Sequence, residues 1–408
     1  ELTVSGSKNA ALPIFAATLL SSGVHRIRNV PALSDIQTMI KILERLGAKV
    51  ELEKKNSYII DTRKINTYTA PYELVKTMRA SFLILGPLIA RFGVAQVSLP
   101  GGCAIGERPV DQHLKGLQKL GAKIELKDGY VNAKAETRLV GSKIVMDLIT
   151  VTGVMNIMMA ATLASGKTII ENAASEPELV ALANALNMAG AKIEITGHHS
   201  IVIHGVSTLK PLDVKVIPDR IEAGTFIMAV AATGGELLLK NIITSDLTST
   251  IAKLQETGLA IEATKNQIHL KSNGRLNHAD ISTAPFPGFP TDLQAQYMAV
   301  AATSKGTSRI TENIFENRFT HVSELRRMGA DIELIGDSAI VKGRLSLSGA
   351  EVMATDLRAS AALIIAGLVA KGVSTIDRIY HLDRGYENIE SKLSKLGGSI
   401  ERKTIKVK

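Results

Sequence analysis

The sequence repeats one pattern six times, and this repetition limits the possible folds more than any other feature. A turn-forming glycine follows an apolar segment and precedes a strand-like one at intervals of 66 to 73 residues. A second marker, of the type LGAKV, recurs out of phase with the first at intervals of 68 to 74 residues. The first marker centres on Gly23, Gly93, Gly166, Gly235, Gly306 and Gly372, and the second on Gly47, Gly121, Gly190, Gly258, Gly329 and Gly397. Two independent markers with one period indicate a chain built from six structural repeats.

Every repeat predicts the same order of elements. In the first repeat an apolar helix over 10–21 leads to a strand over 24–29, and an amphipathic helix over 34–46 follows. The amphipathic helix has apolar side chains at helical spacing and ends at Gly47, which can adopt the left-handed conformation. Two strands follow, and one further strand leads into the next apolar helix. The predicted repeat is therefore β-α-β-α-β-β.

Domain organisation follows from the size of this unit. About 70 residues are too few to bury two helices and a sheet well, whereas three units around shared buried helices make a reasonable domain. We therefore predict an α/β (α+β) chain of two domains with three repeats each. The first domain covers 8–217 and carries a glycine-rich loop at 99–109, and the second comprises 1–7 and 218–408.

The composition excludes several classes of protein. Apolar residues make up 45% and charged residues 21%, which argues against disorder, collagen and coiled coil. The longest uncharged apolar run, at 359–370, is shorter than the roughly 18–20 residues of a membrane span, so no membrane partner is predicted. A single cysteine can form no intramolecular disulfide, which indicates a reducing cytoplasm. The chain begins at Glu1 rather than Met, which is consistent with missing natural N-terminal residues.

The net charge of +9 points to small anions rather than nucleic acid. Aromatic residues make up only 4% of the chain and tryptophan is absent, so a stacking platform for single-stranded nucleic acid is poorly supplied. We therefore predict no nucleic acid partner.

The apolar helices carry charge at their first turns although they should be buried. The charged residues there are Lys8, Arg79, Arg220, Asp292, Asp356 and Arg358. Burying a charged side chain costs free energy, so a charge at the start of a buried helix is unusual for a purely structural residue. If the three buried helices of a domain point the same way, their N-termini converge on one face, where free N–H groups and helix dipoles favour anions. Two such faces opposite each other would form an electropositive cleft. The alternative is that each charge caps its own helix or pairs with a neighbour.

Two further residues, Cys103 and Asp292, can each be interpreted either as catalytic or as inert or structural. Cys103 lies in the loop PGGCAIGERP, where Arg108 and a helix opening at Pro109 would favour its thiolate. The alternative is an inert loop cysteine. Asp292 follows Pro290, and it is either a helix N-cap or a buried carboxylate acting as a base.

Motifs for common cofactors are missing. SGKT at 165–168 lacks the earlier glycine of a P-loop and precedes strand-like residues. No Gly-x-Gly-x-x-Gly follows a strand, and the nine histidines show no metal-ligand spacing. We predict no metal and no organic cofactor.

Segments along nearly the whole chain resemble one enzyme family. They are SGSKNAALP (5–13), KTMRAS (76–81), LPGGCAIGERPVDQH (99–113), PDRIEAGTF (218–226), FPTDLQAQ (289–296), FENRFTHVSELRRMGA (315–330), MATDLRAS (353–360) and DRIYHLDRGYENIE (377–390). In these segments the chain resembles the UDP-N-acetylglucosamine 1-carboxyvinyltransferases, which are enolpyruvyl transferases. The resemblance implies a two-domain inside-out α/β barrel with three β-α-β-α-β-β repeats around buried helices in each domain. The segment Leu148–Gly153 departs from the family's usual Ser-Val-Gly-Ala type.

The resemblance also implies a reaction. The enolpyruvyl group of phosphoenolpyruvate is transferred to the 3′-hydroxyl of UDP-N-acetylglucosamine by addition and elimination, with release of phosphate, in the first committed step of peptidoglycan synthesis. Two alternatives remain open: a shikimate 3-phosphate enolpyruvyl transferase, which lacks the cysteine loop, and a catalytically silent paralogue or an anion- or RNA-binding repeat protein. We also predict that the two domains, joined by only two crossings near 6–7 and 216–219, close over the substrates and exclude water.

Residue roles come from the same resemblance. Cys103 is implied as the acid that protonates the methylene carbon and as the site alkylated by fosfomycin, Asp292 as the base, and Asp356 as a carboxylate beside the reacting carbon. The phosphate of phosphoenolpyruvate is assigned to Lys8, Arg108 and Arg384, and its carboxylate to Arg318 and Arg358. The remaining implied substrate contacts are Asn9, Arg79, Pro109, Val110, Asp111, Gln112, His113, Ile314 and Phe315.

Overall fold

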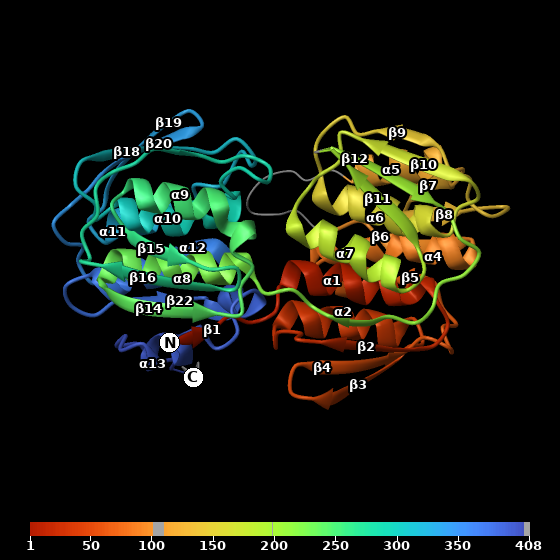
Figure 1. Cartoon of the computed structure of the whole chain (residues 1–408), viewed down its shortest axis with the longest axis horizontal. Coiled ribbons are helices and arrows are strands. Elements are labelled where there is room, and N and C mark those ends of the chain that lie inside the picture. The colour runs from red at the N-terminus through yellow and green to blue at the C-terminus, as the bar shows by residue number, and fades with distance from the viewer. Residues whose placement is uncertain (101–109, 198, 404–408) are drawn as a thin grey trace. The chain divides into compact units, whose positions relative to one another are not determined.

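The computed structural model describes residues 1–100, 110–197 and 199–403. The chain divides into two compact units, an N-terminal unit of residues 6–100 and 110–217 and a C-terminal unit of residues 1–5 and 218–403 (Figure 1). The chain passes from one unit to the other between Ser5 and Gly6 and returns between Ile217 and Pro218. Cys103, Arg108 and Pro109 lie outside the described residues, so their roles stay predictions.

Three four-stranded sheets surround the core of the N-terminal unit. Their strand orders are β13 (Asp213–Lys215), β2 (Val24–Arg28), β4 (Ser57–Asp61), β3 (Lys49–Lys54); β5 (Thr69–Ala70), β6 (Val94–Ser98), β8 (Tyr130–Lys134), β7 (Lys123–Lys127); and β11 (Lys192–Thr196), β12 (Ser200–His204), β10 (Lys167–Glu171), β9 (Lys143–Val145). In each sheet one short edge strand runs parallel to its neighbour and the other pairs are antiparallel. Where both strands of a parallel pair belong to the same repeat, a buried helix connects them, as a crossover connection requires.

The helices of this unit fall into two classes. The inner helices are α1 (Lys8–Ala17), followed by η1 (Thr18–Leu20); α4 (Leu85–Phe92), preceded by α3 (Tyr72–Val75) and η2 (Arg79–Ile84); and α6 (Val151–Thr162). The outer helices are α2 (Ser34–Arg45), α5 (Asp111–Lys119) and α7 (Pro177–Met188). The helices α1 and α6 are apolar on nearly all sides and bury almost every residue in one hydrophobic core. The helix α4 buries its first five residues in the same core and leaves Ala90, Arg91 and Phe92 half-buried. The outer helices bury only one face, which is why their sequences show a helical period.

The C-terminal unit repeats this arrangement with one difference. Its sheets have the orders β1 (Leu2–Thr3), β14 (Gly235–Lys240), β16 (Gln267–Ser272), β15 (Ala260–Ala263); β17 (Ile281–Ser282), β18 (Thr307–Thr311), β20 (Ser338–Lys342), β19 (Asp331–Ile335); and β21 (Glu351–Met353), β22 (Thr375–Asp377). The inner helices are α8 (Arg220–Thr233); α10 (Gln294–Ala301), preceded by η4 (Thr291–Leu293); and α12 (Leu357–Val369). The outer segments are η3 (Thr244–Leu247) with α9 (Thr248–Glu256), α11 (Val322–Arg327), and η5 (Ile379–Arg384) with α13 (Ile389–Lys395). The three inner helices pack against one another in one core.

Five repeats therefore form four-stranded sheets, and the predicted α/β fold around buried helices is confirmed. In the described part of the chain the sheet of the last repeat has two strands, β21 and β22. After Gly397 the segment 399–403 forms no strand. Arg402 instead binds Asp383 at 2.7 Å and Glu390 at 3.3 Å, which holds this segment against η5 and α13.

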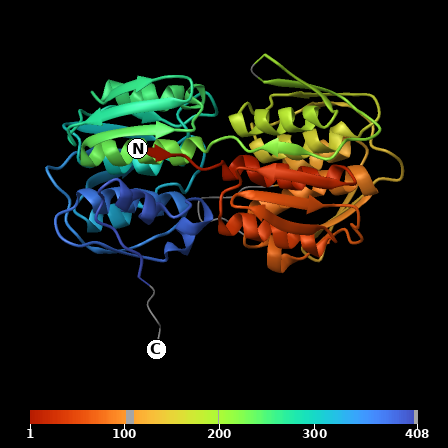
Figure 2. The ribbon, with the colours of Figure 1, turned by 60° about the horizontal axis from the view of Figure 1, so that its bottom comes forward.

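Two sheets take a strand from a distant part of the chain. In the first sheet of the N-terminal unit, β13 from the end of the third repeat pairs with β2 of the first repeat. In the C-terminal unit β1, at the start of the chain, pairs with β14, so that Leu2 lies opposite Leu239 (Figure 2). Neither unit is therefore complete without a strand that lies far away in the sequence.

One of the marker glycines adopts the predicted backbone conformation. Gly47 has a φ of 104°, which confirms the left-handed conformation predicted where α2 ends.

Within the described residues, none of the helices combines the length and hydropathy that crossing a bilayer requires.

We expect Gly86→Ala to destabilise the protein because α4 and α6 approach closely at this residue. A Cβ atom on Gly86 would lie 2.3 Å from the backbone oxygen of Asn156, so one inner helix would have to shift. Overpacking of this kind lowers the free energy of unfolding by about 1–3 kcal/mol. The matched control is Gly367→Ala in α12, where the nearest atom, Cβ of Ser374, lies 3.5 Å away. Urea unfolding should show no loss for the control, because alanine favours helix over glycine; equal losses in both variants would contradict this account.

Candidate active site

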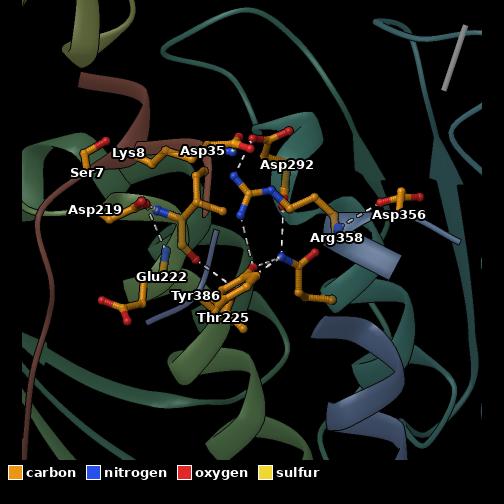
Figure 3. Close-up of polar contacts among 12 residues, drawn as sticks. Ser7, Lys8, Asp35, Asp219, Glu222, Thr225, Asp292, Asp356, Arg358 and Tyr386 are labelled. Carbon is orange, nitrogen blue, oxygen red and sulfur yellow. Dashed lines mark hydrogen bonds and ion pairs between the residues drawn. The ribbon is translucent and has the colours of Figure 1, made fainter. Parts of the chain in front are cut away.

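The three inner helices of the C-terminal unit bring charged first turns together, as the sequence predicts (Figure 3). Two of the carboxylates there cap helices. Asp219 accepts hydrogen bonds from the backbone N–H groups of Ile221 and Glu222 at the start of α8. Asp356 accepts them from Arg358 and Ala359 at the start of α12. Capping is therefore a sufficient structural reason for these two residues.

Asp292 is different because its side chain caps no helix. Its Oδ1 binds Nη2 of Arg318 at 2.8 Å, and its Oδ2 binds Nη2 of Arg358 at 2.8 Å. The side chains of both arginines are only 4% exposed, whereas that of Asp292 is 28% exposed. The N-cap alternative is thus excluded for Asp292, which is a partly open carboxylate between two buried cations.

The two arginines keep this carboxylate ionised. Burial by itself raises the pKa of Asp292, but the charges of Arg358 and Arg318 and their hydrogen bonds outweigh burial and hold the pKa below its usual value. A carboxylate in this state is a weak proton acceptor. It becomes a stronger proton acceptor only if another anion replaces it as the hydrogen-bond partner of the two arginines.

Arg318 has a hydrogen-bond donor that could bind such an anion. Its Nη1 atom is buried and has no hydrogen-bond partner among the described residues. A buried donor without a partner is costly, and an unpaired cationic donor is more so. Its position beside the Asp292 ion pair makes this end of the inner helices a candidate binding site for a small anion.

Arg358 is held from its other side by a buried tyrosine. Its Nη1 atom donates to the hydroxyl oxygen of Tyr386 at 3.2 Å. The same hydroxyl lies 2.9 Å from Oγ1 of Thr225 and 3.0 Å from Nε2 of Gln296. These four residues, which we call the Tyr386 cluster, join the first two turns of α8, α10 and α12.

Asp356 has polar neighbours beyond the helix it caps. Thr320 donates to its Oδ2 at 3.1 Å. Burial opposes ionisation of Asp356, but the backbone N–H of Ala359 and the charge of Arg318 lower the pKa of its carboxyl. Burial also lowers the pKa of the neighbouring His321 to about 4, so its imidazole is neutral at pH 7. Nε2 of His321 is buried without a hydrogen-bond partner among the described residues.

A buried glutamate that the sequence did not single out shapes the adjacent turn. Glu312 accepts hydrogen bonds from the backbone N–H groups of Ile314 and Phe315, at 2.9 and 3.2 Å. Its other oxygen accepts from the hydroxyl of Thr291, the residue before Asp292, at 2.8 Å. Glu312 therefore fixes the predicted substrate-contact turn relative to Asp292.

Other predicted residues of this unit lie nearby in sequence and structure. Phe315 packs under the guanidinium of Arg318, whose central carbon is 5.3 Å from the ring centroid. Arg384 ends η5 two residues before Tyr386, and it is half-buried. The structure thus brings Asp292, Arg318 and Arg358 into direct contact and places Phe315 against Arg318.

The N-terminal unit has its own buried charge at an inner helix. Lys8, in the first turn of α1, binds Oδ2 of Asp35 at 3.0 Å, and both side chains are buried. Ser7 caps this helix by accepting from the backbone N–H of Ala10. Asn9 is half-buried on the same turn, and the half-buried Arg79 begins η2.

The predicted nucleotide contacts at the start of α5 divide into exposed and buried residues. Val110 is half-buried and Asp111 is exposed. Gln112 is buried and accepts from the backbone N–H of Asp147 at 3.0 Å. The imidazole of His113 is buried between Nδ2 of Asn156, at 3.0 Å, and the hydroxyl of Thr152, at 3.3 Å. Burial lowers the pKa of His113 to about 3, so this side chain is a neutral part of the core.

The described residues contain no group of three or more His, Cys, Asp or Glu side chains that could hold a metal ion. The side chains at the candidate site are two arginines around one carboxylate, which is a donor set suited to an anion.

Comparisons with known proteins agree over nearly the whole chain. Residues 1–393 match the family model of EPSP synthase (3-phosphoshikimate 1-carboxyvinyltransferase). The UDP-N-acetylglucosamine 1-carboxyvinyltransferase of Thermodesulfovibrio yellowstonii is 56% identical over 403 residues, which cover 98% of this chain and 96% of that protein. The protein of the same name from Cellvibrio japonicus is 55% identical with the same coverage.

Solved structures share the fold. The enolpyruvyl transferase NikO from Streptomyces tendae superposes with a TM-score of 0.88 at 25% identity, covering 98% of this chain and 94% of that one. An EPSP synthase from Acinetobacter baumannii has a TM-score of 0.76 at 19% identity, covering 97% and 95%, and shows the fold alone. The chain belongs to the EPSP synthase (3-phosphoshikimate 1-carboxyvinyltransferase) family.

Proposed function

We propose that the protein is a UDP-N-acetylglucosamine 1-carboxyvinyltransferase. It transfers the enolpyruvyl group of phosphoenolpyruvate to the 3′-hydroxyl of UDP-N-acetylglucosamine and releases phosphate. Two curated relatives of this name at 55–56% identity support the assignment. The observation in the structure that carries it is the partly exposed carboxylate of Asp292 between two buried arginines, one of which has an unpaired donor.

The chemistry of this site fits an acidic three-carbon substrate. Arg318 and Arg358 bind the carboxylate of phosphoenolpyruvate, because guanidinium groups match a carboxylate in shape and charge. The substrate carboxylate then takes over hydrogen bonds that these arginines otherwise give to Asp292. Without them the pKa of Asp292 rises, and the carboxyl becomes a better proton acceptor for the sugar hydroxyl.

The proposed reaction balances as an addition followed by an elimination. The sugar oxygen bonds to C2 of phosphoenolpyruvate and loses its proton to Asp292, while C3 gains a proton from an acid. A proton then leaves C3 as the C2–O bond to phosphate breaks, which restores the double bond. The acid that the resemblance implies is Cys103, outside the described residues. The substrate contacts implied for Lys8, Asn9, Arg79 and Arg384 likewise remain predictions.

A phosphate-release assay tests the function. Purified protein with phosphoenolpyruvate should release phosphate when UDP-N-acetylglucosamine is added and should release none with shikimate 3-phosphate. Release with shikimate 3-phosphate alone would overturn the sugar nucleotide as acceptor. No release with either acceptor would indicate a silent paralogue.

A cytoplasmic location is part of the proposal. It rests on the one cysteine in 408 residues, which is typical of proteins of reducing compartments. Fractionation of cells that express the protein would test it.

A further inference from the structure

Tyr386 links all three inner helices of the C-terminal unit at the point where the substrate carboxylate is expected. It follows η5, and its side chain is buried, with a relative exposure of 2%. Its hydroxyl meets Thr225 from α8 and Arg358 from α12 (Figure 3). It also meets Gln296 from α10.

The directions of these hydrogen bonds can be assigned from the donors present. Thr225 donates its hydroxyl proton to the backbone oxygen of Ile221 at 2.8 Å, so it accepts from Tyr386. The oxygen of Tyr386 then accepts from two N–H groups, Nη1 of Arg358 and Nε2 of Gln296. Burial raises the pKa of Tyr386, which keeps the phenol protonated and able to donate.

Arg358 is held at two of its nitrogens. Nη2 binds Asp292, and Nη1 binds Tyr386, and these are its side-chain hydrogen bonds within the described residues. When a substrate carboxylate displaces Asp292 from Nη2, the contact to Tyr386 becomes the one that still fixes the plane of the guanidinium. A planar donor group binds a carboxylate well only when its plane is set.

We propose that Tyr386 is a positioning residue that orients the guanidinium of Arg358 for the carboxylate of the enolpyruvyl donor. This inference rests on the proposed function. It assigns to Tyr386 an effect on one substrate and not on the other, because Arg358 carries the donor carboxylate and not the sugar nucleotide.

The test is Tyr386→Phe, which removes the hydroxyl and leaves the ring to fill its space. The matched control is Tyr297→Phe in α10, whose hydroxyl also lies in the core of this unit and donates to the backbone oxygen of Ala279 at 2.7 Å. Steady-state kinetics should show that Tyr386→Phe raises KM for phosphoenolpyruvate about tenfold, which corresponds to about 1.4 kcal/mol. KM for UDP-N-acetylglucosamine should stay within about twofold, and the control should change neither.

The outcomes separate this inference from the proposed function. An active wild-type enzyme in which both variants have the same KM for phosphoenolpyruvate overturns the role of Tyr386 alone. Equal rises of both KM values in Tyr386→Phe would mean general loosening and would also overturn it. A wild-type protein that releases no phosphate with any acceptor overturns the proposed function and this inference with it.

Discussion

Asp292→Asn is expected to reduce kcat by on the order of 10³, because a positioned general base contributes about 10²–10⁴ to the rate. Asparagine has nearly the same shape but cannot accept the proton of the sugar hydroxyl. At the same time it removes the carboxylate that competes with phosphoenolpyruvate for Arg318 and Arg358. KM for phosphoenolpyruvate should therefore stay unchanged or fall while kcat collapses.

This opposite movement of the two constants distinguishes a base from a structural residue. Asp292→Asn leaves two buried cations without their anion, so we also expect a lower melting temperature, which phosphoenolpyruvate should restore more than it does for the wild type. The control is Asp331→Asn, which breaks an exposed pair with Arg344 of the same length, 2.8 Å. Retention of kcat within tenfold in Asp292→Asn would rule out the proposed base.

Arg318→Met is expected to raise KM for phosphoenolpyruvate by on the order of 10²-fold. Truncating one member of a buried, hydrogen-bonded charge pair costs about 2–5 kcal/mol of binding. Arg318 has both a contact to Asp292 and the buried unpaired Nη1, so its loss removes the donor that we assign to the substrate carboxylate. Methionine keeps much of the side-chain volume and limits collapse of the site.

Isothermal titration with phosphoenolpyruvate, in the presence of sugar nucleotide, gives an independent readout besides kinetics. Arg344→Met serves as the control, since Arg344 is 56% exposed and its ion pair with Asp331 contributes little. An unchanged affinity in Arg318→Met would show that the carboxylate binds elsewhere. The loss of one arginine should also move the pKa of Asp292 up towards its usual value, because Arg318 is one of the two cations that lower it.

Much of the fold could be predicted because it depends on local signals that recur. The glycine markers separate helices from strands, and an apolar helix that is hydrophobic on every side has to be buried. The two-stranded sheet that the last repeat forms in the described residues could not be predicted from the same signals. Its markers are intact, but Arg402 finds partners in η5 and α13, and such long-range ion pairs leave no trace in hydrophobic periodicity.

The candidate site was predictable in outline for a similar reason. Charge at the start of a buried helix is conspicuous in a sequence, and this singled out Asp292, Asp356 and Arg358. Two residues that hold this site in place could not be identified from the sequence. Tyr386 and Glu312 look like ordinary residues of their segments, and only the packing of η5 and of the turn after β18 brings them to the inner helices.

The long-range pairing of β1 with β14 sets an order of events during synthesis. Leu2 is made early but lies opposite Leu239, so at a ribosome speed of about 5–20 residues per second it waits for roughly 10–50 s. All strands of the N-terminal unit are translated within that interval, because its last strand, β13, ends at Lys215. The nascent chain can thus finish the N-terminal unit while β1 stays unpaired, and a strand of only two residues offers little edge for mispairing.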